Sequence, residues 1–224
     1  MNIYDLNKLS LLDYPGKVSS IIFLSGCNMN CSYCYNSDLK VKSNGRISEE
    51  ELFEFLKSRI GKIDGVVITG GEPTINKDLP KFIKKIKDLG FLVKLDTNGT
   101  NPKMIEYLIQ NSLVDYIAMD IKNDPLKYNM VTNTNNNIDD ILLSVELIKN
   151  SRIEHEFRTT VFNIHELDDL ISIAKLVSPS RYFLQDFKMN DKVFDKNLFS
   201  KDSKILEEYV ITCNKYTQTN LRKK

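Results

Sequence analysis

The sequence predicts an α/β fold in which a parallel sheet forms a partial, open barrel. Apolar runs of strand length alternate six times with amphipathic helical stretches, and the connections are short. Strands that alternate with helices in this way pair in parallel through right-handed crossovers. Eight such repeats usually need about 250 residues to close a barrel. Six repeats in a chain of 224 residues therefore predict a barrel that stays open.

The N-terminal part leads into the first strand. Residues 1–17 are expected to be a lead-in with a turn at Pro15-Gly16, followed by a buried strand over 18–24. This strand runs directly into Cys27, so a cysteine loop lies at its carboxyl end. Ser48 and Glu51 then form a capping-box pattern, which predicts a helix with apolar residues from 52 to 60.

The alternation continues to the end of the barrel. We expect further strands at 65–69, 91–95, 115–119, 157–162 and 181–187, and helices at about 79–89, 102–109, 138–148, 167–174 and 206–213. The asparagine-rich residues 129–137 predict a mobile polar loop. The chain is expected to be one domain over 1–224, with its core at about 9–187 and a charged tail at 188–224 that carries one helix.

Composition excludes several classes of function. A chain that is 42% hydrophobic and 27% charged suits a compact soluble domain, and a net charge of +1 favours neither nucleic acid nor a membrane surface as a partner. No apolar run approaches the ~18 residues that span a bilayer, and the start lacks the layout of a secretion signal. Three of the four cysteines are clustered, which fits a reducing compartment, so we expect a cytoplasmic protein.

Four polar clusters each follow a predicted strand. They are 27–34, 70–74, 96–99 and 120–122, after the first four strands in turn. In parallel α/β folds the carboxyl ends of the strands form one rim, and binding sites are built there from several loops. The sequence therefore predicts one site at this rim.

Cys27, Cys31 and Cys34 have the spacing C-x3-C-x2-C. Thiolates this close can converge on a soft metal centre. A [4Fe–4S] cluster usually takes four cysteines, so three would leave one iron open for chemistry. A zinc site would need a fourth ligand at a regular spacing. A redox dithiol of Cys31 and Cys34 would leave Cys27 unexplained.

This cysteine motif, with aromatic Tyr33 before the last cysteine, resembles that of the radical S-adenosylmethionine (SAM) enzymes. The resemblance implies that the three cysteines hold a [4Fe–4S] cluster and that SAM binds the fourth iron through its amino and carboxylate groups. The stretch Gly70-Gly71-Glu72 is similar to the GGE motif of that family, which orients the SAM amino group. Read alone, the two glycines and Pro73 predict a tight turn, or a backbone that approaches a ligand closely.

Further stretches resemble those of glycyl-radical enzyme activating proteins, a subgroup of this family. By that resemblance Asp96 and Thr97, in Asp96-Thr97-Asn98-Gly99, and Asp120 with Lys122 surround the methionyl end of SAM. Asp96 and Asp120 would hold a monovalent cation beside the SAM carboxylate, and Lys122 would approach that carboxylate or the substrate. Arg158, on a later strand, would bind a carboxylate. Rim salt bridges and an ordinary Asn-Gly turn are the alternatives for these residues.

The segment Leu9–Lys17 resembles that of activating proteins for anaerobic ribonucleoside-triphosphate reductase, and the stretches 158–161 and 182–187 resemble the same subgroup. This implies reductive cleavage of SAM to a 5′-deoxyadenosyl radical, which generates a glycyl radical on a partner enzyme. A flavodoxin or ferredoxin would supply the electron. Only Cys213 remains outside the motif, so no second cluster is expected; a buried free thiol is its default role.

Two other functions remain open. One is a radical SAM enzyme that acts on a small molecule, of the 7-carboxy-7-deazaguanine synthase type, against which the segment Leu9–Lys17 argues. The other is a non-catalytic iron–sulfur electron carrier, which would leave the clusters at 70–72 and 120–122 unexplained. His155 and His165 lie outside the rim clusters and are assigned surface or core roles. Gln185 could contact SAM or the substrate, although a satisfied core amide is the expected role.

Overall fold

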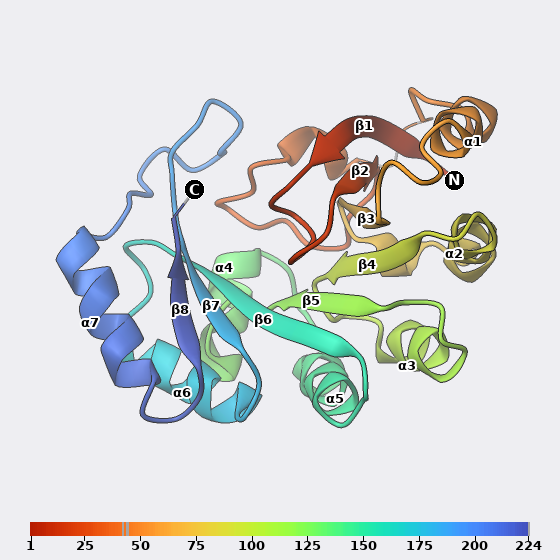
Figure 1. Cartoon of the computed structure of the whole chain (residues 1–224). Helices are drawn as coiled ribbons and strands as arrows, with labels where there is room; N and C mark the ends of the chain where they lie inside the picture. Colours follow the sequence, from red (N-terminus) through yellow and green to blue (C-terminus); the bar gives the residue numbers. More distant parts are fainter. Residues whose placement is uncertain (42, 44, 224) are drawn as a thin grey trace.

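The computed structural model describes residues 1–41, 43 and 45–223, and eight strands in this part of the chain form one curved sheet. The strands lie in sequence order across the sheet (Figure 1). They are β1 (Ile3–Ser10), β2 (Ser19–Leu24), β3 (Gly65–Gly70), β4 (Leu92–Thr97), β5 (Tyr116–Asp120), β6 (Glu154–Val161), β7 (Tyr182–Asp186) and β8 (Thr219–Arg222).

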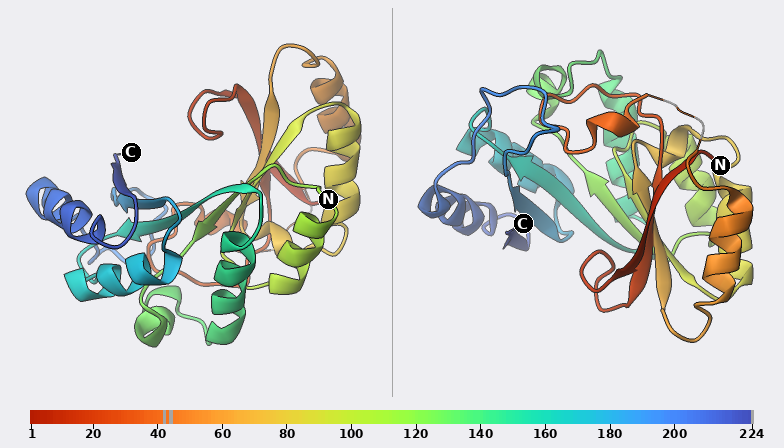
Figure 2. Two further views of the ribbon diagram at one scale, coloured as in Figure 1. Left: turned by 60° about the horizontal axis from the view of Figure 1, so that its bottom comes forward. Right: turned by 90° about the horizontal axis from the view of Figure 1, so that it is seen from above.

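Strands β2 to β8 are parallel, and β1 pairs with β2 in the antiparallel sense. Each of β2 to β7 is followed by a helix, which confirms the six predicted strand–helix repeats. Within the described residues β1 and β8 are the two edges of the sheet and do not pair with each other. The predicted open barrel is therefore confirmed (Figure 2).

The helices cover the convex face of the sheet (Figure 2). They are α1 (Glu49–Lys57), α2 (Leu79–Asp88), α3 (Pro102–Gln110), α4 (Tyr128–Thr132), α5 (Ile138–Lys149), α6 (Leu167–Val177) and α7 (Ser203–Cys213). Because strand side chains alternate between the two faces, Val66 and Ile68 pack in the large core beneath the helices. Val67 lies in a small separate cluster with Tyr14 and Tyr116.

Three predicted segments differ from the structure. The lead-in contains β1, whose polar alternation is tolerated because much of this edge strand is exposed. The loop 129–137 begins with the last turn of α4, and the tail contains β8 as well as the predicted helix. Strand β8 has only four residues and lacks an apolar run, so the sequence pattern did not indicate it.

The caps that the sequence predicted are present. The Ser48 hydroxyl accepts from the backbone N–H of Glu51, whose carboxylate accepts from the N–H of Ser48. Helix α1 ends at Lys57, so Ile60 lies outside it. The N–H of Arg59 donates to the carbonyl of Leu56, which tightens the chain into a 3-10 turn after the α-helix.

In the described part of the chain, none of the helices combines the length and apolarity needed to cross a bilayer.

Candidate radical SAM site

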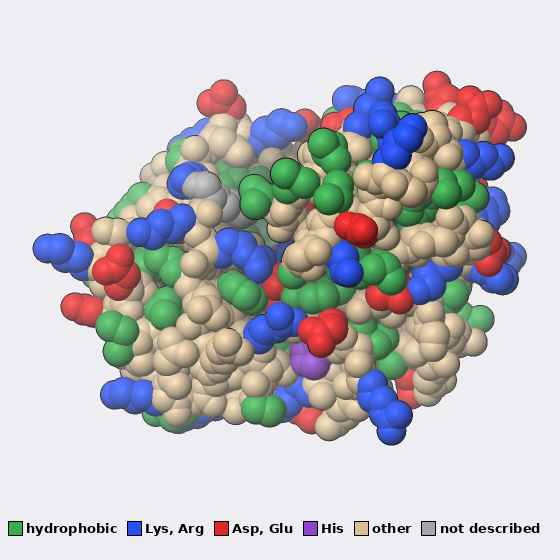
Figure 3. All heavy atoms as spheres, viewed as in Figure 1, with side chains coloured by type: hydrophobic (Ala, Val, Ile, Leu, Met, Phe, Trp, Pro, Cys, Tyr) green, Lys and Arg blue, Asp and Glu red, His purple; other side chains and the backbone are tan. Residues whose placement is uncertain are grey.

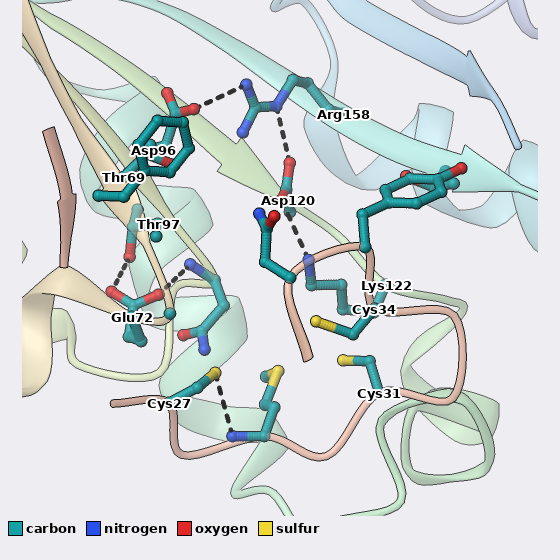
Figure 4. A pocket seen from close by; sticks show the side chains of 18 of the residues that line it. Cys27, Cys31, Cys34, Thr69, Glu72, Asp96, Thr97, Asp120, Lys122 and Arg158 are labelled. Atoms are coloured by element: carbon teal, nitrogen blue, oxygen red, sulfur yellow. Dashed lines mark hydrogen bonds and ion pairs between the residues drawn. The ribbon is translucent and has the colours of Figure 1, made fainter. Parts of the chain in front are cut away.

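A cavity of about 300 Å³ opens at the carboxyl ends of the strands (Figure 4). Every site residue predicted from the sequence lines it, which places residues from four strands (β3 to β6), from the turns that follow them and from the cysteine loop around one space. These residues are Cys27, Cys31, Tyr33, Cys34, Gly70, Gly71, Glu72, Asp96, Thr97, Asp120, Lys122 and Arg158. Thr160 and Gln185 line the same cavity; Gln185 is buried, and its amide oxygen accepts from the Thr160 hydroxyl at 3.4 Å.

The three clustered cysteines lie on the loop that follows β2 and are free thiols. Burial raises the pKa of Cys27 to about 11 and also raises that of Cys31, where Lys122 opposes the effect. A metal centre bound here would favour the thiolate forms of these cysteines. Among the described residues, no three His, Cys, Asp or Glu side chains are grouped closely enough to hold a single metal ion.

Helix α4 supports the cysteine loop from one side. The backbone N–H of Asn30 donates to the carbonyl of Thr132 at 3.0 Å, and that of Ser32 donates to Val131 at 3.3 Å. The Asn30 N–H also donates to the Thr134 hydroxyl at 3.0 Å. Residues 129–132 of the asparagine-rich segment are thus helical and bonded to the cysteine loop, so the predicted loop is wrong for these residues and is confirmed only for 133–137.

Lys40 and the C-terminal segment hold the loop from its other sides. The Lys40 ammonium donates to the Asn30 amide oxygen at 2.8 Å and to the carbonyl of Cys31 at 3.0 Å. After β7, the N–H of Lys188 donates to the Tyr35 hydroxyl at 2.8 Å, and Tyr35 stacks on Phe187. Nothing in the local sequence around Lys40 had indicated this role.

Gly70 and Gly71 are required by the packing of the protein's own backbone. A Cβ atom at Gly70 would lie 2.3 Å from the carbonyl oxygen of Leu24, and Gly70 has a φ of +120°. A Cβ at Gly71 would lie 2.0 Å from the oxygen of Gly26. These contacts bring the end of β3 against the start of the cysteine loop, so the glycines serve this approach in addition to lining the cavity.

Glu72 joins the ends of β3 and β4. Its buried carboxylate accepts hydrogen bonds from the Thr97 hydroxyl at 2.8 Å and the Asn98 N–H at 2.6 Å. It also accepts from the N–H and the hydroxyl of Thr74. Burial raises the pKa of Glu72, and these hydrogen bonds oppose the rise. The carboxylate that the sequence assigned to a ligand therefore also fixes the loop after β4.

Four charged side chains lie next to one another along the cavity and are called the charged row (Figure 4). They are Asp96 on β4, Arg158 on β6, Asp120 on β5 and Lys122 just after β5. Arg158 donates through Nε to Asp120 at 2.7 Å and through Nη1 to Asp96 at 3.3 Å. Lys122 donates to Asp120 at 3.0 Å, and buried Lys94 donates to Asp96. Burial alone would raise the pKa of both carboxyl groups, but Arg158 and the two lysines hold them below their usual values.

A further ion pair, between β8 and β6, lies deeper in the barrel. Arg222 on β8 donates to both oxygens of Glu156, at 2.8 and 3.0 Å, and the Tyr116 hydroxyl donates to the same carboxylate at 2.9 Å. Glu156 is 1% exposed. The sequence prediction missed both Arg222 and Lys94. A signal for Lys94 existed, because a lysine two positions before Asp96 on a strand must share its face.

His165 occupies a core position beside the site. Its Nδ1 accepts from the N–H of Phe162 at 3.4 Å, so Nε2 carries the hydrogen that is donated to the carbonyl of Lys122 at 2.9 Å. Phe162 packs on Tyr33 with ring centroids 4.9 Å apart, and the Lys122 ammonium lies 5.8 Å from the Tyr33 ring. His155 is half-buried on β6 and bonds to the Ser180 hydroxyl.

An open parallel barrel whose first loop carries three free cysteines, facing a Gly-Gly-Glu turn and a charged row, defines the radical SAM class of protein. The family model described as the Radical SAM superfamily matches residues 21–177. The chain therefore belongs to the radical SAM superfamily of enzymes. This family carries a [4Fe–4S] cluster and uses SAM, and the soft sulfur donors of the cysteine loop fit such a cluster.

The chain is also similar in sequence to two curated proteins. The chain is 37% identical over 209 residues to a Methanocaldococcus jannaschii protein provisionally named a glycyl-radical enzyme activating enzyme, with 89% of this chain and 86% of that protein covered. It is 30% identical over 154 residues to the pyruvate formate-lyase-activating enzyme of Clostridium pasteurianum, with 65% of this chain and 63% of that enzyme covered.

Among solved structures, QueE from Escherichia coli has the same fold across the chain. The two superpose with a TM-score of 0.58 at 16% identity, and the match covers 98% of this chain and 92% of QueE. At this identity the likeness concerns the fold alone. Because the match covers 98% of this chain, the similar part includes the open sheet that carries this protein's own cysteine loop and charged row.

Proposed function

We propose that this protein is a glycyl-radical enzyme activating enzyme. The observation that carries the proposal is the convergence, in one cavity, of the free cysteines 27, 31 and 34 with the turn at Gly70–Glu72 and the charged row. The 37% identity to the Methanocaldococcus jannaschii protein, which extends over 89% of this chain, supports the choice of substrate class.

When bound, the cluster and SAM would supply the radical chemistry: one-electron reductive cleavage of the C5′–S bond of SAM to methionine and a 5′-deoxyadenosyl radical, which would take a hydrogen atom from a glycine of the partner. The protein's part is binding, orientation and exclusion of water. Cys27, Cys31 and Cys34 would ligate the cluster and leave one iron for SAM. Backbone at 70–71 and the Glu72 loop would receive the SAM amino group, with Tyr33 and Thr97 beside it.

The charged row would bind the methionyl carboxylate. Lys122 and Arg158 carry the cationic groups of this row into the cavity, and each is held in place by Asp120. An anion that reaches this wall meets donors whose positions are already fixed, so little ordering is needed on binding. The partner would be a glycyl-radical enzyme, and the segment Leu9–Lys17 favours anaerobic ribonucleotide reductase, with a flavodoxin or ferredoxin as electron donor.

The test is formation of a glycyl radical. The anaerobically reconstituted protein is mixed with SAM, dithionite and a candidate partner, either anaerobic ribonucleotide reductase or pyruvate formate-lyase. We expect an EPR doublet on the partner, dependent on SAM and lost in a Cys31→Ala variant but kept in Cys213→Ala. Cleavage of SAM without a doublet on any glycyl-radical partner, together with turnover of a small substrate, would contradict the proposal.

A further inference from the structure

The charged row places Arg158 between Asp96 and Asp120, where the sequence resemblance implied a monovalent cation. The guanidinium is 10% exposed and contacts three carboxylates: Asp120 at 2.7 Å, Asp96 at 3.3 Å and Glu156 at 4.0 Å. Its planar fork lets one side chain donate to both aspartates at once. The space between them is thus filled by a fixed cation that belongs to the chain.

Each oxygen of these two carboxylates already faces a cationic donor. On Asp96, Oδ1 accepts from Lys94 and Oδ2 accepts from Arg158. On Asp120, Oδ1 accepts from Arg158 and Oδ2 accepts from Lys122. A hard monovalent cation needs several oxygen atoms turned toward one point. The four carboxylate oxygens of Asp96 and Asp120 are instead turned toward Lys94, Arg158 and Lys122.

The net charge of these ion-paired side chains also disfavours a bound alkali ion. Four cationic side chains (Lys94, Lys122, Arg158 and Arg222) face three carboxylates (Asp96, Asp120 and Glu156), which leaves one positive charge over. An additional cation would enter a group of side chains that already carries a positive charge, in a partly buried setting where like charges repel strongly. An anion would neutralise it.

We propose that Arg158 is a built-in replacement for the monovalent cation, so that this site needs no alkali ion. It acts as a positioning residue: it fixes Asp96 and Asp120 and supplies the charge that faces the ligand's carboxylate. The claim about alkali ions concerns the chain's own contacts and holds whichever partner the enzyme activates. The claim about the ligand's carboxylate depends on the proposed function.

The first test compares cations at constant ionic strength. Thermal unfolding of the metal-free wild-type protein is followed in KCl, NaCl and tetramethylammonium chloride, and SAM affinity of the cluster-loaded protein is measured in the same salts. We expect the same Tm in all three salts and SAM dissociation constants within about twofold, because a ligand stabilises only what it binds. A saturable Tm increase or a tenfold gain in SAM affinity with K⁺ or Na⁺ would overturn the proposal.

The second test creates the missing site. Arg158→Ala removes the guanidinium and leaves Asp96 and Asp120 around the vacated space, so K⁺, Na⁺ or millimolar guanidinium should raise the Tm of this variant in a saturable way. Arg181→Ala is the matched control, because Arg181 pairs with exposed Glu154 at 2.8 Å; its Tm should not respond. Arg158→Ala that folds and responds to no cation would count against the replacement role. If it does not fold, a rubidium soak of wild-type crystals decides: anomalous density between Asp96 and Asp120 refutes the proposal, and its absence supports it.

Discussion

At the scale of single residues, His165 links the loop after β6 to the end of β5. The Phe162 N–H fixes the tautomer by donating to Nδ1, and Nε2 then donates to the carbonyl of Lys122. Both nitrogens are used by the neutral ring, so a proton can be added only by losing the bond from Phe162. Burial also lowers the pKa of His165, because the charged imidazolium would lose its hydration in this position.

This predicts a pH dependence of stability that one histidine controls. The unfolded chain binds a proton at His165 below about pH 6.5, whereas the folded protein does so only at lower pH. The free energy of unfolding should therefore fall as pH drops below about 6.5, by at most about 1.4 kcal/mol per pH unit. Urea titrations of wild type and His165→Gln at pH 5.0 to 7.5 measure it.

The variant should lose this slope while Gln still donates to Lys122. The chain has two histidines, so His155→Gln is the matched control and should keep the slope. A slope that persists in His165→Gln, or that disappears in His155→Gln, would show that His165 is not the responsible group.

The position of Cys27, Glu72 and Asp120 around one cavity was predictable from the sequence, because each belongs to a motif that follows a strand. Their local partners were not. Arg158 was expected to bind a ligand's carboxylate, yet in the structure it bonds to Asp96 and Asp120. Sequence period shows which face of a strand a residue takes, but the pairing of charges across three strands depends on register and side-chain conformation.

At the scale of elements, the turn after β3 is a junction between strands. Glu72 accepts from donors at Thr74, Thr97 and Asn98, so the ends of β3 and β4 share one carboxylate. Exchange of this group for an amide would turn an NH2 toward one set of these donors. A buried donor without a partner costs about 1–3 kcal/mol.

Glu72→Gln should therefore lower the free energy of unfolding by about 1–3 kcal/mol, measured by urea denaturation. Glu106→Gln is the matched control, because Glu106 is exposed on α3 and bonds to the side chain of Gln110. The control should change stability by less than about 0.5 kcal/mol. Equal effects of the two substitutions would contradict the junction role.

Elements with strong periodicity, such as α2 and β3, were predicted from sequence, and elements held by distant partners were not. Helix α4 is short and lies in an asparagine-rich stretch, which by local propensity favours a turn. It is stabilised by tertiary contacts, since its last carbonyls accept from Asn30 and Ser32, about 100 residues earlier in the chain. Local composition cannot report a contact of that range.

At the scale of the whole molecule, the curvature of the sheet lets a side chain of its last strand, the edge strand β8, reach into the barrel. Arg222 on β8 reaches Glu156 on β6, past the intervening β7. The segment expected to be a charged tail thereby neutralises a carboxylate that is almost fully buried. Successive ion pairs connect this strand with the side of the cavity that faces the cysteine loop. They run through Arg222, Glu156, Arg158, Asp120 and Lys122.

Arg222→Ala should destabilise the protein by about 2 kcal/mol. Loss of one partner of a buried ion pair costs about 3–5 kcal/mol, but Arg222 is 35% exposed and Tyr116 still donates to Glu156, so the loss is smaller. A Glu156→Gln/Arg222→Ala double variant should recover part of it. Lys223→Ala, beside it on an exposed pair with Glu207, is the control and should have little effect. Additive losses in the double variant would argue against the pairing.

The central claim is that the loop of Cys27, Cys31 and Cys34 holds the centre at which SAM is cleaved. The most direct measurement is the 5′-deoxyadenosine released by the reconstituted protein with SAM and dithionite, without any partner. We predict that wild type and Cys213→Ala release it, and that Ala at position 27, 31 or 34 reduces release to background and lowers bound iron. Release that is unaffected by these three substitutions, or wild-type protein that carries the cluster and releases none, would contradict the account.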